Sequence, residues 1–136
     1  SMFDKGVKVI HAAAGGVGVG VINEAKTRTQ AGKKVWVVGV DVDQYSEGII
    51  ADGSSVILTS AVKYVDVAAY DMIKAELNKE FEGGRSLLLS TKEDGVGIPE
   101  TNPNLSDEVQ SKVKEIHEKI KNGEIVISSV QGDLFK

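Results

Sequence analysis

The sequence predicts an α/β fold, in which a Rossmann-like parallel sheet is flanked by helices. Apolar runs alternate with amphipathic stretches along the chain, as they do in sheets whose strands are joined by crossover helices. Residues 35–40 form a nearly continuous apolar run, which is typical of a parallel strand covered on both faces. The chain has 136 residues, 41% hydrophobic and 26% charged, and this composition indicates one ordinary globular domain.

Strands are predicted at residues 7–14, 35–40, 56–59 and 86–90, with a short strand at 96–98 and a closing strand at 124–129. Helices are predicted at residues 16–30, at 106–122, and from about 65 to the glycine pair 83–84. Gly32 suits the left-handed position that ends the first helix, and Ser106 is a favourable N-cap for the last. Residues 1–130 are interpreted as one lobe and residues 131–136 as a loose tail.

Charge and composition exclude several classes of protein. The net charge is −4 and no basic run is present, which argues against nucleic-acid binding. The absence of cysteine rules out disulfides, thiolate catalysis and zinc–thiolate sites. His11 is expected in a core or along a pocket, and His117 on the outer or boundary face of a helix. Since neither has triad partners in its pattern, the sequence nominates no catalytic residue and no cofactor.

A glycine-rich segment follows the first predicted strand. In open α/β sheets, ligands bind beyond the carboxyl ends of the strands, where Gly15 and Gly16 would let backbone approach a ligand. The dinucleotide pattern G-x-G-x-x-G fails, because Val21 and Asn23 stand where its last glycine is required. The segment also lacks the P-loop pattern. A purely structural tight turn is the alternative.

Two charged residues follow the next two strands. Asp41 ends the most apolar strand, where a carboxylate can accept two hydrogen bonds from the vicinal hydroxyls of a ribose. Lys63 is expected at the start of a helix, where its charge opposes the helix dipole, so an acidic partner or a hydroxylated ligand would compensate for it. The alternatives are a solvated loop, with Asp43 as a turn residue, and an ordinary surface lysine.

Several segments together resemble the basic membrane protein family. These are V-I-H-A-A-A-G-G-V-G-V-G-V (9–21), W-V-V-G-V-D-V-D-Q (36–44), T-S-A-V-K-Y-V-D-V-A-A-Y-D (59–71), G-V-G-I-P (95–99) and L-S-D-E-V (105–109). Members of that family are bacterial substrate-binding lipoproteins of ABC transporters, and the best-understood ones are similar to purine nucleoside receptors. The resemblance implies a type I periplasmic-binding-protein fold, in which two lobes close on a ligand.

The resemblance also implies roles for individual residues. Asp41 and Lys63 would bind the ribose hydroxyls, and Gly15, Gly16 and Val17 would line the cleft. The family usually has a small polar residue at the position of Val17 and an aromatic residue at that of His11. The chain matches the C-terminal lobe without its first strand and helix, and the start Ser1-Met2 is interpreted as the point at which the receptor was cut.

Partners and location follow from the same resemblance. The whole protein would bind a nucleoside, deliver it to an ABC permease, and be lipid-anchored at the cell surface or in the periplasm. The lobe alone is expected to bind nucleosides negligibly. A missing strand and helix would uncover a sheet edge and a helix-docking face, which favours a homodimer with exchanged elements. The alternatives are a nucleotide- or NAD-dependent enzyme and a regulatory module that reuses the lobe.

Overall fold

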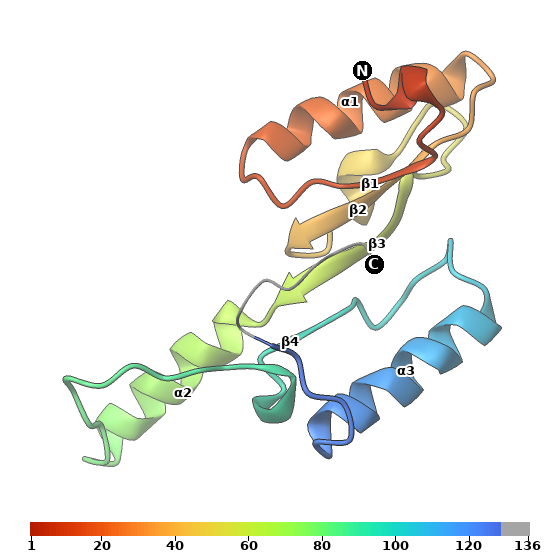
Figure 1. Ribbon diagram of the computed structural model, residues 1–136. Helices are drawn as coiled ribbons and strands as arrows, with labels where there is room; N and C mark the ends of the chain where they lie inside the picture. The colour runs from red at the N-terminus through yellow and green to blue at the C-terminus, as the bar shows by residue number, and fades with distance from the viewer. Residues whose placement is uncertain (129–136) are drawn as a thin grey trace.

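The computed structural model describes residues 1–128 and contains a four-stranded sheet (Figure 1). The strands lie in the order β1 (Val9–His11), β2 (Trp36–Asp41), β3 (Ile57–Lys63) and β4 (Val96–Gly97). The first three are parallel, whereas β4 pairs antiparallel with β3. The predicted α/β class is therefore confirmed, and the sheet is mostly rather than wholly parallel.

Three α-helices and three short 3₁₀ turns make up the remaining regular structure of residues 1–128. The α-helices are α1 (Val17–Gln30), α2 (Val65–Leu77) and α3 (Asp107–Lys121), and the turns are η1 (Phe3–Lys5), η2 (Tyr45–Gly48) and η3 (Thr91–Glu93). Gly32 has a φ of 80°, as the end of α1 requires. The hydroxyl of Ser106 accepts a hydrogen bond from the Val109 N–H, so it caps α3 as predicted.

The core lies between α1 and one face of the sheet. It consists of Phe3, Ile22, Ala25, Val35, Val37, Val56 and Ile57. Side chains alternate between the faces of a strand, so Val40 points away from the face that Val37 gives to this core. Val40 instead lines a cavity whose far wall is α3. One face of the sheet is thus closed by α1, and the other faces α3 across open space.

Two predicted strands are wrong, and a third is longer than expected. Residues 86–90 and 124–128 are not strands; residues 89 and 90 instead lie against the turn η3 and Gly95, where the Gly95 N–H donates to the Ser90 carbonyl. Residue 129 and the predicted tail, 131–136, lie outside the described residues. β3 continues to Lys63 because Ser60 and Ala61 pair with β2 despite their low hydrophobicity. Lys63 therefore ends a strand and does not begin a helix.

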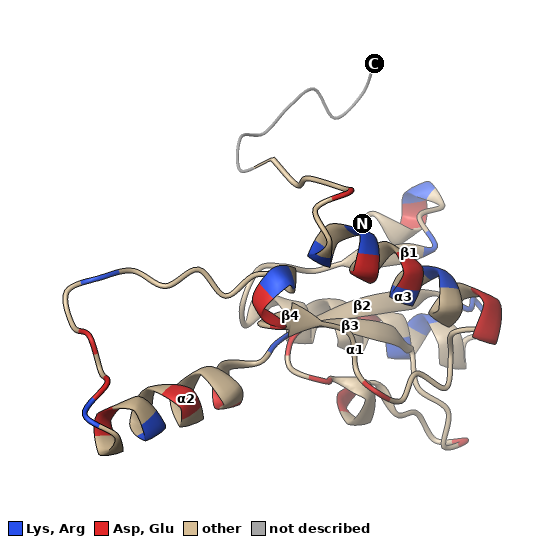
Figure 2. Ribbon diagram, turned by 90° about the horizontal axis from the view of Figure 1, so that it is seen from below, with Lys and Arg blue, Asp and Glu red and all other residues tan. Residues whose placement is uncertain are grey.

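The second helix differs most from expectation. Its apolar residues predict an inward face, yet none of its residues is buried. Figures 1 and 2 show α2 standing away from the sheet and from the other two helices. It ends at Leu77, before the glycine pair, and Lys79 follows with a left-handed φ of 61°. In the described part of the chain, no helix is both long and apolar enough to span a membrane.

Candidate functional site

The candidate site lies where the three parallel strands end. β1 leads into the glycine-rich turn before α1, β2 ends at Asp41, and β3 ends at Lys63. Because the strands are parallel and neighbouring, their carboxyl ends meet at one edge of the sheet. The structure therefore brings together the three groups that the sequence singles out.

Asp41 and Lys63 form an ion pair at this edge. Lys63 Nζ lies 2.8 Å from Asp41 Oδ1, and the two side chains are 61% and 55% exposed. The acidic partner expected for Lys63 is thus Asp41. Because both side chains are more than half exposed, their charged groups are accessible to a ligand. An ion pair this exposed contributes little to stability. Together they offer acceptor oxygens and ammonium donors to a pair of neighbouring hydroxyl groups.

The glycine turn contributes backbone to the same edge. Gly15 is left-handed, with a φ of 55°, and Gly16 begins α1 without a side-chain cap. Val17 is exposed at the first helical position. A Cβ at Gly18 would lie 3.6 Å from the Ala12 carbonyl oxygen, an ordinary contact. The turn thus exposes backbone at the start of a helix, although the N–H groups of Val17, Gly18 and Val19 already donate to the carbonyls of residues 14–16.

A partly buried hydrogen-bond network, which the sequence did not predict, holds the loop after β2. The Val40 N–H donates to Gln44 Oε1 over 2.9 Å, and the Gln44 N–H donates to Ser60 Oγ over 3.1 Å. Ser60 is fully buried. A Cβ at Gly39 would lie only 2.5 Å from Ser60 Oγ, so the network depends on glycine there. The available signal was a serine in the middle of an apolar strand.

Asp43 serves a local role in the same loop. Its Oδ1 accepts a hydrogen bond from the Tyr45 N–H over 3.0 Å, which is the Asx-turn arrangement. The turn interpretation of Asp43 is therefore confirmed. Asp41, by contrast, adopts a φ of 72°, an uncommon conformation for a residue other than glycine. Asp43 thus stabilises the loop through a backbone hydrogen bond, whereas Asp41, two residues earlier, pairs with Lys63.

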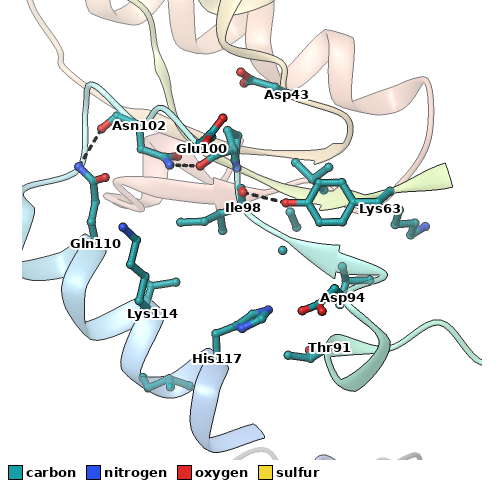
Figure 3. A pocket seen from close by; sticks show the side chains of 18 of the residues that line it. Asp43, Lys63, Thr91, Asp94, Ile98, Glu100, Asn102, Gln110, Lys114 and His117 are labelled. Atoms are coloured by element: carbon teal, nitrogen blue, oxygen red, sulfur yellow. Dashed lines mark hydrogen bonds between the residues drawn. The ribbon is translucent and has the colours of Figure 1, made fainter. Parts of the chain in front are cut away.

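An open cavity of about 1180 Å³ adjoins the site, between the sheet and α3 (Figure 3). We call it the sheet–α3 groove. Its walls include His11 from β1 and His117 from α3, so His11 lines a pocket and is not part of the core. Within residues 1–128, no group of three His, Asp, Glu or Cys side chains could hold a metal ion.

An ion pair joins Asp94, which lines the groove, to Lys121 at the end of α3. Lys121 Nζ lies 2.6 Å from Asp94 Oδ2, and its hydrogen bond lowers the pKa of the Asp94 carboxyl below its ordinary value. Because the folded pKa is lower than the unfolded one, the pair stabilises the fold above about pH 4. That stabilisation is lost as the pH falls through the folded pKa.

We expect Asp94→Asn to lower the urea midpoint at pH 7, and this deficit to shrink as the pH is lowered toward 3. Asn tolerates the left-handed φ of 53° at this position, so the change removes charge without adding backbone strain. Asp71→Asn on α2, where no ion pair is formed among the described residues, serves as the control. A deficit that stays constant with pH would show that the ion pair does not cause it.

A comparison of the sequence with models of protein families identifies the family of this chain. The model of the family described as ABC transporter substrate-binding protein PnrA-like (Bmp) matches residues 1–131. The chain belongs to this family. The resemblance to basic membrane proteins is therefore confirmed, and the Bmp family consists of transporter substrate-binding proteins, which are not enzymes.

Relatives and a solved structure agree with this assignment. This Bmp chain is 41% identical over 133 residues to the CD4+ T-cell-stimulating antigen of Listeria monocytogenes, covering 93% of this chain and 37% of that protein. It is 32% identical to the ABC transporter nucleoside-binding protein BmpA of Lactococcus lactis, covering 95% and 38%. It therefore spans under two-fifths of the length of either relative.

The fold of this Bmp chain also matches an ABC transporter solute-binding protein of known structure from Aeropyrum pernix. The TM-score is 0.74 at 25% identity, and the match covers 97% of this chain and 43% of the other. Nearly the whole chain, including the outlying α2, thus corresponds to part of a larger solute-binding protein.

Proposed function

We propose that this chain is one lobe of a two-lobed receptor that binds a nucleoside, with a purine base preferred, for uptake through an ABC permease. The Asp41–Lys63 pair carries the proposal. It is exposed at the carboxyl edge of the sheet, and its acceptors and donors suit the 2′- and 3′-hydroxyls of a ribose. The nucleoside-binding relative from Lactococcus lactis supports the same substrate class.

The glycine turn complements this pair. Gly15, Gly16 and Val17 would line the ligand cleft, with backbone rather than side chains facing the nucleoside. Because Val17 has no hydroxyl or amide group, the turn offers main-chain hydrogen bonds only. In the whole receptor we propose a lipid anchor at the cell surface or in the periplasm. For the chain by itself we propose a homodimer.

The experiment is a calorimetric titration of inosine into two proteins: the full-length receptor and the present 136-residue chain. We expect saturable binding to the full-length protein. The chain alone should give only heats of dilution, because half of the cleft leaves the ligand largely in water. Guanosine and uridine, titrated in parallel, test the preference for a purine.

Two results would contradict the proposal. The first is a full-length protein that binds none of the three nucleosides. The second is tight binding to the 136-residue chain alone, which would make a second lobe unnecessary. Addition of either protein to NADH, followed by nicotinamide fluorescence, tests the dinucleotide alternative, and we expect no change in the emission.

A further inference from the structure

Asp41, which carries the proposed ribose contact, lies at the centre of an unusual backbone turn. The Val42 N–H donates to the Val40 carbonyl over 2.9 Å, and the φ of Asp41 between them is 72°. These are the features of a γ-turn with a left-handed central residue, which is rare and strained. A strained conformation persists only where the surrounding structure enforces it. Other residues must therefore hold Asp41 in this turn.

Gln44 holds the turn at the residue before Asp41. Residues 39–41 of β2 extend past the last pairing with β1. There the Val40 N–H donates to Gln44 Oε1 over 2.9 Å. Since the carbonyl of Val40 accepts the hydrogen bond from Val42, both backbone groups of Val40 have their partners in the loop. The peptide groups on both sides of Val40, directly before Asp41, are thereby fixed.

Gln44 is itself anchored to the sheet and to the turn η2. Its N–H donates to Ser60 Oγ over 3.1 Å, and Ser60 is fully buried on β3. Its Nε2 donates to Glu47 Oε2 over 2.9 Å. A Cβ at Gly39 would lie 2.9 Å from Gln44 Oε1, so the amide packs against bare backbone. Both ends of the side-chain amide thus have partners within the protein, and the role that this leaves to Gln44 is to position the loop.

We propose that Gln44 and Ser60 are positioning residues, which hold Asp41 in the γ-turn with its carboxylate beside Lys63 before a ligand arrives. Lys63 Nζ lies 2.8 Å from Asp41 Oδ1, so the turn brings the carboxylate to the second residue of the proposed ribose contact. A loop ordered in advance loses less conformational freedom on binding, which raises the affinity. The effect on affinity rests on the proposed nucleoside function, whereas the effect on the loop does not need a ligand.

The first test measures amide hydrogen exchange in the present chain by NMR. Gln44→Met keeps the length of the side chain and removes both of its polar groups. We expect the Val40 and Val42 amides to exchange about tenfold faster in this variant, because their hydrogen bonds open locally. The Trp36 N–H, which donates to the Lys8 carbonyl over 2.8 Å, should keep its rate. An unchanged rate at Val40, or an equal acceleration at Trp36, would overturn the proposal.

A rescue variant separates positioning from a general loss of stability. In the double variant Gln44→Glu/Glu47→Gln, a carboxylate at position 44 accepts from the Val40 N–H and an amide at position 47 donates to it, while the net charge stays the same. We expect the slow exchange at Val40 to return. Gln44→Glu alone sets two carboxylates against each other and should exchange faster than the double variant. A double variant that exchanges as fast as Gln44→Met would contradict the role of the Oε1 acceptor.

The last test is a calorimetric titration of inosine into the full-length receptor. We expect Gln44→Met to weaken binding by about tenfold, the cost of ordering a loop on binding, and the double variant to recover most of it. The control is Gln110→Met on α3, where the lost amide donates to the Leu105 carbonyl over 3.0 Å, and it should bind like the wild type.

The two kinds of measurement separate the two proposals. A wild-type receptor that binds no inosine would contradict the nucleoside function, and the exchange rates at Val40 and Val42 would still decide whether Gln44 holds the turn. A wild-type receptor that binds inosine, with the same affinity in Gln44→Met, would overturn the positioning role and leave the nucleoside function intact.

Discussion

Asp41→Ala in the full-length receptor is expected to weaken the binding of inosine by about 100-fold or more. If the carboxylate accepts hydrogen bonds from both ribose hydroxyls, its removal costs at least about 3 kcal/mol, because hydrogen bonds to charged groups are the strong ones. We expect a loss of stability on the order of 1 kcal/mol, because alanine is strained at the left-handed φ of 72°, whereas loss of the largely exposed Asp41–Lys63 pair costs little. Calorimetric titration measures the affinity, and urea unfolding of the same samples measures the stability.

Two variants make this result specific. Asp41→Asn tolerates the left-handed φ of 72° and loses only the charge, so we expect an intermediate loss of affinity. Asp43→Asn changes an aspartate in the same loop whose carboxylate oxygen accepts a backbone hydrogen bond, and asparagine preserves that bond. It should bind inosine like the wild type. Unchanged affinity in Asp41→Ala would remove the ribose role assigned to this residue.

Ile57→Ala is expected to lower the free energy of unfolding of the chain by about 2–5 kcal/mol. Ile57 is completely buried in the core beside Val37 and Val56, and its removal leaves a cavity that the packed strands cannot close. Ile57→Val should cost only about 0.5–1.5 kcal/mol. Urea denaturation of all variants at one protein concentration measures these differences, because any contribution from self-association is then the same for each variant.

The control for this prediction is Val126→Ala. The Val126 side chain is 85% exposed, so the change should stay within about 0.5 kcal/mol of the wild type. A loss at Ile57 no larger than the loss at Val126 would show that the face of the sheet under α1 is not the core that stabilises the chain.

The strands that bury apolar residues between α1 and the sheet could be predicted from their composition. The run 7–14 contains β1 and the run 35–40 overlaps β2. The side chains that these strands give to the core face, Ile10 and Val37, are apolar and β-branched, as burial favours. The run 86–90 is also apolar at its centre, with three leucines, but it forms no strand in this chain. Pairing depends on a neighbour in space, and local sequence does not supply that information.

The candidate site also has a part that the sequence could predict and a part that it could not. Asp41 and Lys63 could be nominated because parallel strands deliver their carboxyl ends to one edge. The sequence did not decide whether Lys63 has an acidic partner, a hydroxylated ligand or only solvent around it, and the structure places it 2.8 Å from Asp41. The support from Gln44 and Ser60 could not be predicted, because it joins residues 16 positions apart through side chains whose burial only the packed sheet determines.

The sequence by itself determined the α/β class, the order of the main elements, the glycine turn and the two charged residues at the strand ends. These follow from periodicity and from the rule that parallel strands share one edge. The tertiary structure alone decided that α2 leaves the sheet and that the groove beneath α3 stays open. An apolar stripe predicts that one face of a helix is buried, but it does not identify the surface that buries it, because that depends on which elements meet in space.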